Sequence, residues 1–121
     1  MRGLGFGMVF VGAWLLGSTG VRAQISDDVV KVGVLTDMSS LYSDGTGQGS
    51  FVAAQMAAED FGGAVAGVPI QVIAADHQNK PDVGANIARH WYDSEKVDVI
   101  ADVVTSSIAL AVQAVARGKN K

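Results

Sequence analysis

The chain has 121 residues, no cysteine and a formal net charge of −3, with nine Lys/Arg against twelve Asp/Glu. This acidic balance argues against a nucleic-acid partner, because binding phosphates needs clustered cations. The lack of cysteine excludes a disulfide scaffold and any metal site with cysteine ligands.

The first 23 residues have the pattern of a cleavable secretory signal peptide. Arg2 gives a positive start, residues 3–21 are uncharged and largely apolar, and Val21-Arg22-Ala23 offers a cleavage site after Ala23. An uncleaved membrane anchor is the alternative, since the uncharged run approaches the length of a bilayer span. The glycines in the run favour cleavage, which predicts a periplasmic protein. Residues 24–121 keep seven of the nine cations and all twelve acidic residues, a formal charge of −5.

After the signal, the first predicted strand is the β-branched run 29–35. The first helix is predicted over about 47–60 and stops at Gly62-Gly63. Its apolar residues fall at helical spacing and form one stripe, made of Phe51, Val52, Ala54, Met56, Ala58 and Phe61.

The second predicted strand covers 69–75. The second helix has Pro81 in its first turn and continues through Val83, Ile87 and Trp91, which are four residues apart. The third strand is predicted over 97–101. The third helix begins at Thr105-Ser106-Ser107 and stops at Gly118.

Three strand-then-helix units predict an α/β fold with a flavodoxin-like parallel sheet, in which the first strand lies between the other two (order 2-1-3). Right-handed crossovers then bring the loops that leave the strand ends to one edge of the sheet. Residues 118–121 resemble the turn into a further strand. We therefore expect the chain to be cut off inside a larger domain.

Two loops next to the predicted switch point of the sheet are the candidate ligand site. Thr105, Ser106 and Ser107 open a helix, whose free amides and positive dipole end favour a carboxylate or phosphate. Plain helix capping is the alternative. In the first loop, Leu41 and Tyr42 are bulky residues without an obvious core. Tyr42 suits a pocket wall with a polar tip, and the alternative is a surface tyrosine packed on its own loop.

The remaining motifs do not indicate a catalytic, metal-binding or cofactor-binding site. The glycine-rich segment 45–50 is not a dinucleotide fingerprint, because Ser50 replaces the third glycine and the segment begins too far after the strand. His77 and His90 stand apart from ligand-spaced carboxylates and are interpreted as surface or structural. Asp76 is expected to cap the turn at Gln78. With no nucleophile–base pattern, metal site or cofactor motif, the sequence does not indicate an enzyme.

The order and spacing of these segments resemble the leucine/isoleucine/valine-binding family of ABC-transporter solute-binding proteins, which have the type I periplasmic binding fold. The matching segments are 32–40 with Tyr42 and 57–63, then 67–72 with 76–81, then 97–102 with 105–107 and 109–112. The resemblance implies that residues 24–121 are the N-terminal part of lobe 1 of a two-lobed clamp. It also implies that Thr105–Ser107 hold the ligand's carboxylate, with Tyr42 as a pocket wall. The second lobe and the hinge lie outside these 121 residues.

The resemblance further implies capture of branched-chain amino acids or related small carboxylates by lobe closure, without catalysis, and delivery to an ABC permease in the inner membrane. The opening Thr36-Asp37-Met38-Ser39 resembles a subgroup that binds aromatic carboxylates, which gives a second expectation for the ligand. The sensor domain of a receptor and a secreted enzyme remain as alternatives from other classes.

Overall fold

The computed structural model describes residues 25–121, and the predicted signal peptide lies outside the described residues. The elements follow one another as β1 (Val30–Thr36), α1 (Gly47–Asp60), β2 (Ala64–Val65), β3 (Val68–Asp76), α2 (Pro81–His90), the π-helical turn η1 (Trp91–Glu95), β4 (Val99–Ala101) and α3 (Ser106–Gly118). Within this part of the chain, every helix is too short or too polar to cross a membrane.

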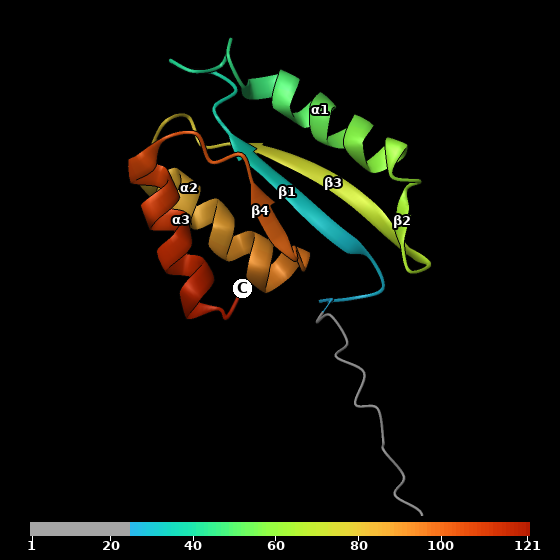
Figure 1. The fold of residues 1–121 in the computed structure, drawn as a ribbon. Helices are drawn as coiled ribbons and strands as arrows, with labels where there is room; N and C mark the ends of the chain where they lie inside the picture. Colours follow the sequence, from blue (N-terminus) through green and yellow to red (C-terminus); the bar gives the residue numbers. More distant parts are fainter. Residues whose placement is uncertain (1–24) are drawn as a thin grey trace, which may run out of the picture.

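A four-stranded sheet in the order β2-β3-β1-β4 forms the centre of the structure (Figure 1). β1 runs parallel to both of its neighbours and pairs Val32 with Val72 of β3 and with Val99 of β4. Because β1 is flanked on both sides, Val34 and Leu35 are buried. The predicted order, with the first strand between the other two, is confirmed.

β2 is a short antiparallel strand that the sequence analysis missed. It pairs with the start of β3 through a two-residue turn, Ala66-Gly67, in which both residues have positive φ (49° and 82°). Such backbone angles match the right-handed twist of a hairpin, but the usual sequence signal is Asn or Asp before the glycine. Because alanine stands in that place, this turn is difficult to predict from the sequence.

The helices cover the sheet unequally. Figure 1 shows α1 on one face of the sheet, with α2 and α3 on the other. The main core lies between the sheet, α2 and α3, where the buried apolar residues are Leu35, Ala85, Ala88, Trp91, Val97, Ile108, Val112 and Val115.

On the opposite face, α1 packs mainly on β1 and β3, with one narrow side toward the sheet. Phe51, Ala54 and Ala58 are half-buried there. The wider apolar stripe predicted for this helix is wrong, because Val52, Met56 and Phe61 are 42%, 58% and 66% exposed.

The connection from α2 to β4 also departs from prediction. The α-helix ends at His90 and Trp91 starts a wider π-helical turn, which stops at Lys96 in a left-handed conformation (φ 59°). This turn directs Val97 into the core, and the strand starts only at Val99. The wider turn also seats the Trp91 ring on β1. A Cβ at Gly33 would lie 2.4 Å from Cζ3 of that ring, so only glycine fits there.

Candidate functional site

The candidate site lies at the edge of the sheet where β1, β3 and β4 end. Since these strands are parallel, the loops 37–46, 77–80 and 102–105 all leave at that edge, which is uppermost in Figure 1. The structure thus places the loop of Leu41 and Tyr42 at the same edge as the start of α3. All five predicted ligand residues belong to this edge.

Asp37 organises the first loop. Its carboxylate is buried and accepts hydrogen bonds from the amides of Ser40 (2.9 Å), Tyr42 (2.9 Å) and Ser39 (3.4 Å), and from the Ser40 hydroxyl (2.6 Å). Burial alone raises the pKa of Asp37, but the Ser40 hydroxyl and these amides outweigh it and lower that pKa to about 2. The carboxylate is therefore ionised at neutral pH and fixes the shape of the loop.

The same loop holds the backbone of Tyr42 from both sides. Its amide donates to Asp37, and its carbonyl accepts from the amides of Gly45 (3.0 Å) and Thr46 (3.1 Å) and from the Thr46 hydroxyl (3.0 Å). The Tyr42 side chain remains 43% exposed, and that of Leu41 is 75% exposed. A rigid backbone thus presents two bulky side chains to solvent.

Asp76, at the end of β3, ties the second loop to the first. Its carboxylate accepts from the amides of Met38 (2.9 Å) and Gln78 (2.8 Å) and from the Ser39 hydroxyl (2.5 Å). The expectation that Asp76 caps the turn at Gln78 is confirmed. Burial raises the pKa of Asp76, yet the hydroxyl and the two amides lower it overall.

The third loop is joined to the second through Asn79. The Thr105 hydroxyl donates to Oδ1 of Asn79 at 2.9 Å, and the Asn79 amide donates to Nδ1 of His77 at 3.0 Å. His77 is fully buried, in line with its interpretation as a structural residue. His90 is exposed, and its Nε2 lies 3.3 Å from Oε1 of Glu95.

The start of α3 keeps its first amides free of side-chain caps. Thr105 has the extended backbone of an N-cap residue (φ −108°, ψ 131°), but its hydroxyl makes no capping hydrogen bond in the described structure. The first turn of a helix has no intrahelical partners for its amides. Ser106 and Ser107 are exposed whereas Ile108 is fully buried, so the start of the helix, with the positive end of its dipole, is accessible at the sheet edge through these two serines.

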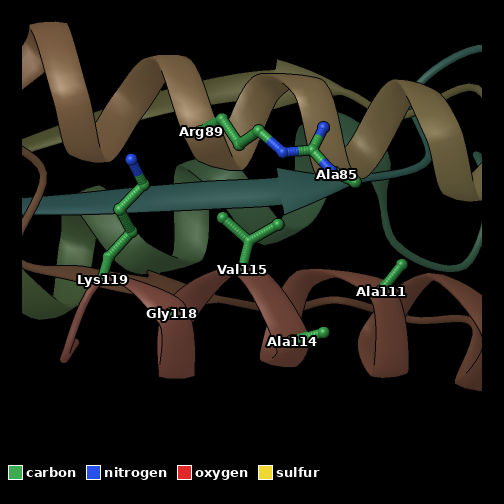
Figure 2. Close-up of a pocket in the computed structure, with 7 residues that line it drawn as sticks. All are labelled: Ala85, Arg89, Ala111, Ala114, Val115, Gly118 and Lys119. Carbon is green, nitrogen blue, oxygen red and sulfur yellow. The ribbon is translucent and has the colours of Figure 1, made fainter.

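A separate hollow of about 440 Å³ lies between α2 and α3, away from the strand ends. Figure 2 shows it lined by Ala85 and Arg89 of α2 on one side and by Ala111 and Val115 of α3, with Lys119 just after α3, on the other. Lys119 is paired with Asp93 at 2.6 Å, and Arg89 donates to Asn86 at 2.7 Å. None of the five predicted ligand residues lines this hollow.

The stability of the protein is expected to fall in acid in two stages. Burial lowers the pKa of His77 below 6.5, although the negative charges of Asp37, Asp76 and Asp102 act to raise it. As the pH falls below about 6.5, His77 therefore takes up a proton more readily in the unfolded chain than in the folded one, and the stability of the fold declines. Asp37, with a folded pKa of about 2 against 3.8 unfolded, contributes stability above about pH 4 that is lost as the pH approaches 2.

Urea unfolding between pH 7 and pH 2.5 measures both stages. His77→Asn removes the titrating ring and is expected to flatten the profile just below pH 6.5, whereas Asp37→Asn is expected to flatten it below pH 4. Profiles parallel to that of the wild type in both variants would contradict this assignment. Asp76 and Asp98, whose pKa values are also lowered, contribute with the same sign as Asp37 and remain in both variants.

Two residues that shape the site, Asp37 and Asn79, were not predicted from the sequence. Asp37 had a local signal, since an aspartate at a strand end, with Ser39 and Ser40 two and three residues later, favours a carboxylate-capped turn. Asn79 had none, because its partner Thr105 is 26 residues away in the chain.

Comparison with known proteins finds one matching family and several similar solved structures. The profile of a family described as periplasmic binding protein matches residues 29–121. No curated protein sequence matches the chain. A solved periplasmic binding protein from Burkholderia mallei is 49% identical to this chain over 78% of its length, with a TM-score of 0.75. A branched-chain amino acid ABC transporter periplasmic ligand-binding protein from Burkholderia xenovorans is 50% identical over 76%, with a TM-score of 0.73.

A third solved structure has a bound ligand. It is an ABC-transporter solute-binding protein from Rhodopseudomonas palustris in complex with 3,4-dihydroxybenzoic acid, 29% identical over 74% of this chain with a TM-score of 0.65. The matches cover 25%, 25% and 24% of the three solved chains. The chain thus spans about a quarter of the length of its solved relatives.

Proposed function

Because the chain belongs to the periplasmic binding protein family, we propose that its strand-end edge forms one wall of a site that captures a small carboxylate in the periplasm for an ABC transporter. The observation that carries this proposal is the uncapped start of α3, where accessible amides and hydroxyls meet the positive end of the helix dipole. In this proposal the turn of Thr105, Ser106 and Ser107 binds the carboxylate group, and the Thr105 hydroxyl, which donates to Asn79, orients the turn and does not itself donate to the ligand.

Tyr42 and Leu41 supply the apolar part of the proposed site. Their side chains are exposed on a loop whose backbone is fixed by Asp37, so ordering them on a ligand costs side-chain entropy but little additional backbone entropy. An aromatic ring with a polar tip suits either an aliphatic or an aromatic ligand body. Asp37 and Asp76 are negatively charged neighbours of the proposed site. Their carboxylates accept hydrogen bonds from the loops themselves, so their charges are stabilised without groups that the ligand anion needs.

The ligand class follows from the chemistry that the two relatives share. The Burkholderia xenovorans protein is described as the periplasmic ligand-binding protein of a branched-chain amino acid ABC transporter, and the Rhodopseudomonas palustris protein is in complex with 3,4-dihydroxybenzoic acid. Both kinds of ligand carry one carboxylate on an apolar body. We propose a ligand of that class, captured by closure of two lobes without a chemical step.

The proposal extends to processing and partners. Residues 1–23 are the signal peptide, cut after Ala23, and residues 24–121 contribute to lobe 1. The partner that receives the ligand is an ABC permease in the inner membrane. Family membership supports the periplasmic location and the transporter, and the sequence pattern of the first 23 residues supports export.

Thermal unfolding of the full gene product tests the ligand class. Isoleucine and benzoate are compared with isoleucinamide and benzamide, which keep the apolar body and lose the negative charge. At a concentration of 100 times Kd a ligand stabilises the folded state by about 2.7 kcal/mol, which raises the melting temperature measurably. At least one carboxylate is expected to do so and its amide is not. Equal stabilisation by acid and amide, or none by either, would contradict the proposed site.

A further inference from the structure

We infer that Asn79 is a positioning residue for this site: anchored on the buried ring of His77, it holds the Thr105 hydroxyl off its own helix and so leaves the first amides of α3 open to a ligand carboxylate. This inference rests on the proposed function. Asn79 touches no ligand group in this account, because it acts only through the orientation of Thr105.

The anchor is His77, which is held by burial, by its backbone and by a hydrogen bond at Nδ1, while Nε2 of its ring has no hydrogen-bond partner in the described structure. Its ring is fully buried, its amide donates to the Thr36 carbonyl at 2.9 Å, and its own carbonyl accepts from the Lys80 amide at 2.9 Å. Because Nδ1 accepts the Asn79 amide at 3.0 Å, the ring is neutral and carries its hydrogen on Nε2. The turn after β3 is therefore held to the end of β1 and to a rigid ring.

Asn79 itself takes a conformation that few residues adopt. Its φ is 55°, in the left-handed region where asparagine is several-fold enriched among residues with a side chain. This conformation lets the backbone amide reach His77 while Oδ1 accepts the Thr105 hydroxyl at 2.9 Å. One residue thus connects the ends of β3 and β4 across the edge.

The bond to Asn79 competes with self-capping by Thr105. A threonine in the extended N-cap conformation normally turns its hydroxyl oxygen toward the amide two or three residues on, here Ser107 or Ile108. In this structure the hydroxyl is turned to Asn79 and caps neither amide. Of these two amides, that of the exposed Ser107 is the one that the proposed carboxylate needs, since Ile108 is fully buried. A cap bond of ordinary strength corresponds to about a fivefold change in an equilibrium constant, which sets the expected effect on ligand affinity.

Asn79→Gly tests the inference with little other change. Glycine keeps the left-handed backbone and the amide that donates to His77, and removes only the acceptor for Thr105. In the ligand-free protein, the hydroxyl of Thr105 is then expected to cap its own helix, which slows solvent exchange of the Ser107 and Ile108 amides measured by NMR. Affinity for isoleucine or benzoate, whichever binds the wild type, is expected to fall about fivefold in calorimetry.

Gln78→Gly is the matched control. Gln78 also has a left-handed backbone (φ 53°), lies next to Asn79, and has an exposed side chain whose only side-chain partner in the described structure is Lys80. This variant is expected to leave both amide exchange and affinity unchanged. A loss of affinity equal to that of Asn79→Gly would attribute the effect to turn flexibility and overturn the inference.

A double variant isolates the route through Thr105. In a Thr105→Val background there is no hydroxyl to orient, so adding Asn79→Gly is expected to change affinity no further. An unchanged fivefold loss in that background would overturn the inference. The exchange measurement needs no ligand: if neither acid binds the wild type, the proposed function fails, while the exchange rates of Ser107 and Ile108 still decide whether Asn79 orients Thr105.

Discussion

Replacing Ser106 by proline is expected to weaken binding of the carboxylate ligand about 10- to 100-fold without unfolding the helix. Proline is favoured at the first helical position, and the extended backbone of Thr105 (ψ 131°) is the conformation that a residue before proline prefers. The substitution therefore removes one amide hydrogen from the start of α3, together with the Ser106 hydroxyl, and keeps the helical backbone. Loss of a hydrogen bond to a charged group costs about 1.5–3 kcal/mol, which gives the stated range of affinity.

Ser106→Ala is the control for this prediction, because it removes the hydroxyl and keeps the amide. Calorimetric titration with the acid that stabilises the wild type compares the two variants, and circular dichroism confirms equal helix content. A larger loss for proline than for alanine is expected. Affinity within twofold of the wild type in Ser106→Pro would mean that this amide does not contact the ligand.

Gly33→Ala is expected to destabilise the protein by about 3 kcal/mol, since overpacking of a core costs about 1–3 kcal/mol and the clash here is severe. The added Cβ would lie 2.4 and 2.6 Å from two carbons of the Trp91 ring, and the ring is itself in the buried core. Because β1 is the central strand, it has little freedom to move away. Urea unfolding measures the change in the free energy of unfolding.

Two further variants show whether the Trp91 ring is the cause. Trp91→Leu removes the ring, so Gly33→Ala is expected to cost much less in that background, and the two effects are then not additive. Gly49→Ala is the control for glycine replacement as such, because no atom lies within 4 Å of its added Cβ. In α1 that change is expected to stabilise by about 0.5–1 kcal/mol. A full loss from Gly33→Ala even without the ring would point to the strand backbone instead.

Much of the fold could be predicted from local patterns. Continuous β-branched runs predicted the three strands of the parallel sheet, of which β1 alone has fully buried residues in the described structure. The hydroxyl run at Thr105 predicted the start of the third helix within one residue. The predicted family and the type I periplasmic binding fold are confirmed by the family match and by relatives at 49% and 50% identity. These features depend on spacing along the chain, which a single sequence displays.

The features that escaped prediction depend on tertiary contacts. The π-helical turn starts at Trp91, whose ring packs against Gly33, more than fifty residues earlier in the chain. The contact of Asp76 with Met38 and that of Asn79 with Thr105 join loops that only the folded sheet brings together. The predicted residues Leu41, Tyr42, Thr105, Ser106 and Ser107 are at one edge as expected, and their contact with a ligand stays a prediction.

An NMR titration of the full gene product with isoleucine and with benzoate tests the central claim most directly, because it reports on each backbone amide. Binding of the acid is expected to give its largest amide shifts at Ser106, Ser107 and Ile108, with changes in the Tyr42 ring. Saturable binding that leaves these three amides unmoved, while others far from the strand ends shift, would contradict the claim that the start of α3 holds the carboxylate.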